Sequence, residues 1–160
     1  MKGVILDEGF EYYTYMNVVL TPIKDDFKKY NWLITDYDCS HYPDPRIQYV
    51  ENHAWISGED FLGIVERHEI QFIWAVFSAI PKQVPLEEVL KYDLPQADGY
   101  RGFWENPITI QHPLAEMEIV PWDSGLVLLI AKEDDCVTRF AKHFPLSRDL
   151  AQYNAQRRPS

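Results

Sequence analysis

The sequence of 160 residues lacks the short motifs by which common catalytic and nucleotide-binding sites are recognised. Its seven glycines are scattered singly, and neither GxGxxG nor GxxxxGK[ST] occurs, so no phosphate-cradling loop is predicted. HExxH and GxSxG are also absent. The nearest relative of GxSxG is WDSG at residues 122–125, which lacks the first glycine and is typical of a hairpin turn. We therefore assign no residue a catalytic role, and an enzyme is the less favoured class.

Basic residues are scarce, since 15 Lys and Arg stand against 25 Asp and Glu, a net charge of −10. Phosphate and anionic lipid both bind to a cationic surplus, so neither nucleic acid nor a membrane surface is an expected partner. No apolar run approaches the about 20 residues of a membrane span. Lys2 is followed by only three apolar residues, which predicts no signal peptide and hence a cytoplasmic protein.

The chain has only two cysteines, Cys39 and Cys136, and they form no CxxC pair. In a reducing cytosol we expect both to be free thiols. The Cys and His spacing matches no zinc frame, and the sequence gives no sign of a cofactor.

The composition, 46% hydrophobic and 25% charged, is typical of a folded globular domain. The length favours one domain over residues 1–155 with a loose tail at residues 156–160. Segments with strand and helix periodicity follow one another without a regular βαβ order. These patterns predict an α+β class, with a mixed or antiparallel sheet of about six strands and four to five short helices.

Short apolar runs bounded by turn residues predict the strands. The run at residues 70–80 is apolar at nearly every position, which is typical of a central strand covered on both faces. The other candidate strands are residues 2–6, 30–36, 47–50, 54–57, 108–111, 116–120 and 126–131.

Apolar residues three and four positions apart predict the helices, and Ser, Asp and Pro predict their ends. Ser57 begins an S-x-x-D helix start, and Ser147 is the expected cap of the last helix. The predicted helices are residues 10–20, 58–68, 85–92, 134–144 (capped by Asp134 or Asp135) and a final one containing Leu150 and Tyr153.

The densest set of possible ligands lies in residues 36–44, where Pro43 and Pro45 predict a loop. Its spacing matches no ligand frame, because an EF-hand counted from Asp36 needs glycine where His41 stands. We therefore predict no metal site. In one alternative, a small enzyme or ligand-binding domain uses a carboxylate–histidine site built from Asp36, Asp38 and His41.

Aromatic residues make up 14% of the chain, and several lie beside acids in segments predicted to be irregular. Trp and Tyr in such places are typical of interface anchors, although they also serve to roof a core. A non-catalytic module that binds a basic protein partner is the leading interpretation. A regulatory protein that forms homo-oligomers through an exposed strand edge is a third possibility. The predicted interface consists of Asp36, Tyr37, Asp38, His41, Tyr42, Asp44, Tyr100, Phe103, Trp104 and Glu105.

The order of six short strings along the chain resembles a family of small bacterial proteins classed as a domain of unknown function. The strings are KGVIL, LTPI, KYNWLI, FIWAVFSAIP, LVLLI and KEDDCV. The resemblance implies a bacterial α+β protein and brings no activity, cofactor or catalytic residue. In composition the chain also resembles bacterial immunity proteins that neutralise antibacterial toxins, which are commonly small, acidic, cytoplasmic and rich in aromatic residues. This second resemblance implies an acidic surface that complements a basic toxin.

Overall fold

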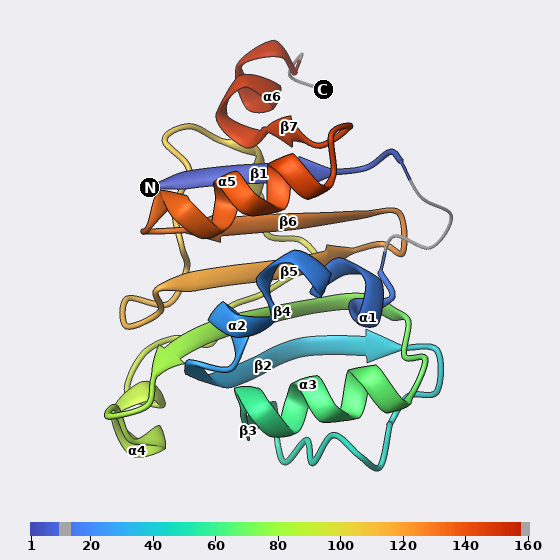
Figure 1. Ribbon diagram of the computed structural model, residues 1–160. Helices are drawn as coiled ribbons and strands as arrows, with labels where there is room; N and C mark the ends of the chain where they lie inside the picture. The colour runs from blue at the N-terminus through green and yellow to red at the C-terminus, as the bar shows by residue number, and fades with distance from the viewer. Residues whose placement is uncertain (10–13, 158–160) are drawn as a thin grey trace.

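The computed structural model describes residues 1–9 and 14–157, and in them seven strands form one antiparallel sheet (Figure 1). The predicted α+β class is confirmed, with an antiparallel sheet of seven strands where about six were expected. The strand order is β3-β2-β4-β5-β6-β1-β7. The strands are β1 Lys2–Leu6, β2 Tyr30–Cys39, β3 His53–Ser57, β4 Phe72–Pro81, β5 Met117–Trp122, β6 Leu126–Ala131 and β7 Arg148–Asp149.

Six α-helices and two 3-10 turns connect or follow these strands in the described residues. In the helix predicted at residues 10–20, Met16–Val19 are helical, and residues 10–13 lie outside the described residues. The helices are α1 Met16–Val19, α2 Lys24–Phe27, α3 Gly58–Arg67, α4 Leu86–Val89, α5 Asp134–His143 and α6 Leu150–Gln156, with 3-10 turns η1 Thr21–Ile23 and η2 Gly102–Trp104.

N-cap residues were predicted for three helices, and the structure confirms one of them. The Ser57 hydroxyl accepts a hydrogen bond from the Asp60 amide at 3.2 Å, as the S-x-x-D pattern predicts. The last helix is capped by Asp149 and not by Ser147, because residues 148–149 first pair with β1 as β7. α5 begins at Asp134, as predicted, but its N-cap position is Glu133 and not Asp134 or Asp135.

The strands predicted at residues 47–50 and 108–111 are wrong. In the first segment only Val50 is paired, in an isolated bridge to His53 across a turn. In the second segment, Ile108 and Ile110 pack against the face of the sheet opposite α3. Apolar residues alternate there because one side of this segment is buried against the sheet. The segment does not pair with any described strand of the sheet.

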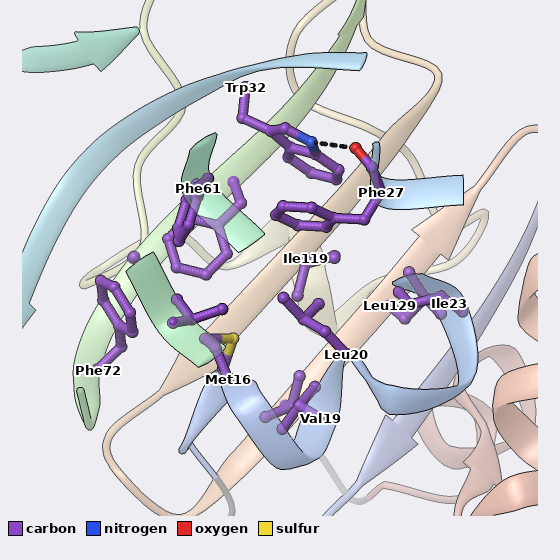
Figure 2. Packing of buried hydrophobic residues seen from close by; sticks show 14 of the residues in the cluster. Met16, Val19, Leu20, Ile23, Phe27, Trp32, Phe61, Phe72, Ile119 and Leu129 are labelled. Carbon is purple, nitrogen blue, oxygen red and sulfur yellow. Dashed lines mark hydrogen bonds between the residues drawn. The ribbon is translucent and has the colours of Figure 1, made fainter. Parts of the chain in front are cut away.

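One face of the sheet is covered by α1, α2, α3 and α5, and the largest core cluster lies beneath them (Figure 1). Figure 2 shows Phe27 stacked on Trp32, with ring centroids 4.2 Å apart, while Trp32 Nε1 donates to the Phe27 carbonyl at 2.9 Å. Gly58 begins α3 directly against this carbonyl, since a Cβ at Gly58 would lie 2.1 Å from it. Only glycine therefore lets α3 approach the end of α2 so closely.

The opposite face is covered mainly by the irregular segment 90–116, together with α4 and α6. β4 pairs with a strand on each side and is buried on both faces over residues 75–80, as predicted for residues 70–80. We call residues 90–116 the cover segment. Among the described residues no helix is long and apolar enough to cross a membrane.

Candidate functional site

The first half of the predicted 36–44 loop is strand, because β2 continues to Cys39 opposite the long strand β4. The register shifts between Thr35 and Asp38, and Asp36 at the bulge has φ +48°, in the left-handed region. Side chains alternate across a strand. Tyr37 therefore belongs to the core on the helix face, whereas Asp38 lies opposite Trp74 and projects from the face under the cover segment.

Asp36 joins the two stretches of the predicted interface. Its Oδ2 accepts hydrogen bonds from the backbone amides of Ala97 at 2.7 Å and Asp98 at 3.1 Å. The Asp36 amide in turn donates to the Tyr49 hydroxyl at 3.2 Å. The bulge thus holds residues 97–98, which directly precede the predicted interface residues 100–105, beside the end of β2. Asp36 and Ala97 are 61 residues apart in the sequence.

Six aromatic rings pack together next to this junction, and Trp122 lies at their centre. Its ring centroid is 4.6 Å from that of Trp74, 5.3 Å from Trp104 and 5.7 Å from Phe103, each in an edge-on arrangement. Phe103 is buried, and the other five rings are partly exposed. Such edge contacts hold the rings in fixed orientations. The aromatic cluster consists of Trp74, Tyr100, Phe103, Trp104, Trp122 and Tyr153.

Five carboxylates lie on β2 next to β4, in the cover segment or directly after β5, and none forms an ion pair with a described residue. Three cations share the area: Arg148 lies over the Tyr153 ring at 4.9 Å, Arg157 lies over the Trp104 ring at 5.1 Å, and Arg101 is exposed next to Tyr100. We call the carboxylates and the cluster together the acidic aromatic face. The carboxylates are Asp36, Asp38, Asp98, Glu105 and Asp123.

Tyr37 and Asp44, which the sequence assigned to the interface, are buried and structural. The Tyr37 hydroxyl accepts from the Asp44 amide at 3.0 Å, and the Tyr37 ring packs 4.8 Å from that of Tyr49. The Asp44 carboxylate accepts from Arg46 Nε at 2.8 Å and Nη2 at 2.6 Å, and this guanidinium lowers the pKa of Asp44. Phe103, a third predicted interface residue, is also enclosed, within the aromatic cluster.

His41 and Tyr42 are exposed in the turn that follows β2, away from the acidic aromatic face. No hydrogen bond or ion pair joins the His41 side chain to Asp36, Asp38 or any other described residue. Within residues 1–9 and 14–157 no group of three or more His, Cys, Asp and Glu is placed to hold a metal ion. The arrangement therefore offers the alternative carboxylate–histidine site no acid–base pair.

Glu118 on β5 is the titratable residue that sequence reasoning missed. It is fully buried under the cover segment, where its Oε2 accepts from the Gln111 amide at 2.9 Å and its Oε1 has no partner among the described residues. Burial raises the pKa of Glu118 to about 7. The signal in the sequence is an acid amid the apolar residues of MEIVPW. Because its carboxylate accepts a hydrogen bond from the backbone of Gln111 in the cover segment, we assign it a role in holding that segment.

Both cysteines are free and buried, as predicted. Burial raises the pKa of the Cys39 thiol and raises that of Cys136 to about 11. Because the thiolate is the reactive form, neither side chain is an activated nucleophile at neutral pH.

Comparison of the chain with known proteins finds no matching family model, curated protein or solved structure. The case for a function therefore rests on the geometry of the chain itself.

Proposed function

We propose that this protein is a non-catalytic binding module that presents its acidic aromatic face to a basic protein partner, in the manner of bacterial immunity proteins. The observation that carries the proposal is the pair of hydrogen bonds from the amides of Ala97 and Asp98 to Asp36. These bonds bring the acids at the end of β2 to the same face as the aromatic cluster.

The rings supply the apolar part of such an interface. Trp and Tyr are the residues that most often dominate binding energy, because each buries a large area with few rotatable bonds. Trp74, Trp104 and Trp122 are already held by one another in the free protein. Little side-chain freedom is therefore lost when a partner covers them.

The unpaired carboxylates supply the charge. Most cations of the chain pair with acids outside this set of five, among them Arg46 with Asp44, Arg139 with Asp26 and Lys82 with Glu59. The carboxylates of the acidic aromatic face are free to meet Lys and Arg of a partner. A net charge of −10 also steers a basic protein toward the chain, so that association is fast and slows as salt is added.

A homo-oligomer formed through this face is disfavoured by the same charges. A twofold interface brings a patch against its own copy, so the five carboxylates would face five others. Like charges that face each other across an interface weaken binding by roughly several kcal/mol.

The test is capture of the partner from cells of the source organism with two matched variants. Asp38→Asn/Asp98→Asn removes two charges from the acidic aromatic face, and Asp134→Asn/Asp135→Asn removes two from α5 on the helix face. We expect the wild type and the α5 variant to retain the same basic protein, with an association rate that falls with ionic strength. Equal capture by both variants, or an association rate that salt leaves unchanged, would contradict the proposal.

A further inference from the structure

The strand β3 leaves one of its two edges open. It is the first strand in the sheet order and pairs only with β2. In an antiparallel ladder, the backbone groups of alternate residues point toward and away from the neighbouring strand. His53 exchanges two backbone hydrogen bonds with Val50 on its outer side, so Trp55, two residues later, also directs its N–H and C=O outward. No described residue bonds to these two groups of Trp55.

A hollow of about 460 Å³ lies along this edge. Residues 54–57 of β3 form one wall, α3 forms the second, and residues 46–48 form the third. Figure 1 shows the connection from β2 to β3 passing below α3 before it returns to the sheet edge. Four residues of strand span about 13 Å, at about 3.3 Å per residue, so the hollow faces a full stretch of β3.

The charged residues that line this hollow are Arg46, Arg67 and Asp60, and the Asp44 carboxylate offsets the charge of its partner Arg46. Arg46 is held in place by its two hydrogen bonds to Asp44. Arg67 has no ion-pair partner in the part of the chain that the structure describes.

The Arg67 guanidinium lies beside a glycine in the middle of α3. A Cβ at Gly63 would lie 3.2 Å from Arg67 Nη2, so the guanidinium lies close along the helix surface there. Glycine inside a helix costs about 1 kcal/mol relative to alanine. The hollow thus combines an outward-facing backbone pair with a cation that lies along its helical wall.

We propose that the open edge of β3 binds an extended peptide segment that carries carboxylate side chains and adds to the sheet as a further strand. The peptide backbone exchanges hydrogen bonds with Trp55, and its carboxylates meet Arg67 and Arg46. Addition of a strand to a sheet edge is a common mode of peptide recognition, in which backbone bonds give affinity and side-chain pockets give specificity. Guanidinium groups bind carboxylates with paired, charge-assisted hydrogen bonds.

Two other occupants fit the hollow less well. A small anion would leave the Trp55 carbonyl without a donor, since an anion only accepts hydrogen bonds. A second copy joined edge to edge would set Arg46 and Arg67 against the same residues of its neighbour, because a twofold contact is self-complementary. The proposal is independent of the acidic aromatic face, which includes part of the cover segment and lies on the opposite face of the sheet from α3.

The experiment titrates the isotope-labelled full chain with the peptide acetyl-TVEVEVT-amide at up to about 1 mM and follows backbone amide signals by NMR. Two matched peptides separate the contributions: one has lysine in place of glutamate, and the other is N-methylated on the central backbone amides. We expect the acidic peptide to shift the Trp55 amide and to slow its hydrogen exchange. Each control peptide should bind at least about tenfold more weakly, having lost the charge or the backbone bonds.

Two variants test the cation. Arg67→Gln and Lys142→Gln each remove one positive charge from the last turn of an exposed helix, so their effects on helix stability are comparable. We expect Arg67→Gln to weaken binding of the acidic peptide about tenfold and Lys142→Gln to leave it unchanged. The proposal is overturned if the lysine or N-methylated peptide binds as well as the acidic one, or if no amide of β3 shifts. Shifts of these amides with protein concentration alone would also overturn it, in favour of a second copy.

Discussion

Glu118 gives the stability of this protein a specific dependence on pH. Its carboxyl is fully buried under the cover segment, and burial raises its pKa from an ordinary 4.5 to about 7. Between these two values the folded protein keeps a proton that the unfolded chain has released. The free energy of unfolding therefore falls as the pH rises through this window. At about 1.4 kcal/mol per pH unit the total loss is ~3 kcal/mol, of which ~2.5 kcal/mol falls between about pH 5 and pH 8.

The substitution Glu118→Gln isolates this effect. Glutamine keeps an oxygen that accepts the hydrogen bond from the Gln111 amide, and it carries no proton that titrates in this range. Urea unfolding across this range gives the free energy of unfolding of both proteins. In the difference between the two values, the contributions of every other titrating group cancel. We expect the free energy of unfolding of the variant, minus that of the wild type, to increase by ~2.5 kcal/mol from about pH 5 to pH 8.

A control with the same chemical change comes from Glu87, which is exposed in the first turn of α4. Glu87→Gln should show no gain of comparable size over the same pH range. The reasoning about Glu118 is refuted if the difference between wild type and Glu118→Gln stays constant from acid to alkaline pH. Such a result would mean that the buried carboxyl releases its proton at the same pH in the folded and unfolded states.

Three further outcomes follow from the packing. Gly58→Ala should lower the free energy of unfolding by about 3 kcal/mol in urea titrations, because its Cβ would lie 2.1 Å from a backbone carbonyl. Gly125→Ala, whose Cβ would lie 3.6 Å from the Asp123 carbonyl oxygen, should change the free energy of unfolding by less than about 1 kcal/mol. Asp36→Ala should speed hydrogen exchange at the two cover-segment amides that bond to its carboxylate, and unchanged exchange would show that they are held by something else. Both thiols should stay unreactive toward a disulfide reagent in the folded protein and react once it is unfolded in denaturant, whereas fast labelling of the native protein would contradict their burial.

Local signals accounted for the elements that the sequence predicted well. The strands at residues 2–6, 54–57 and 126–131 were bounded by turn residues, and α3 followed its serine cap. The failures at residues 47–50 and 108–111 share one cause. Alternating apolar residues show that one side of a segment is buried, and they do not show whether its backbone has a partner strand.

The candidate site could be predicted only in part, because its assembly depends on contacts between distant segments. Asp36, Asp38, Tyr100 and Trp104 were chosen for their residue types, and the structure places them near one another. The continuation of β2 to Cys39 depends on the length of β4, more than thirty residues further along the chain. That pairing assigned Tyr37 to the core and Asp38 to the opposite face, which composition alone does not distinguish.

The acidic composition has a different meaning on each side of the sheet. On the helix side, carboxylates such as those of Asp26, Glu59 and Glu66 pair with Lys or Arg of the same chain, and exposed pairs of this kind contribute little to binding or stability. Under and around the cover segment, the carboxylates beside the aromatic cluster have no such partners among the described residues. The hollow beside β3 differs, because Arg67 on its helical wall has no ion-pair partner among the described residues. A cation there and carboxylates on the acidic aromatic face favour two different ligands, since a partner whose charge matches one of these sites is repelled by the other.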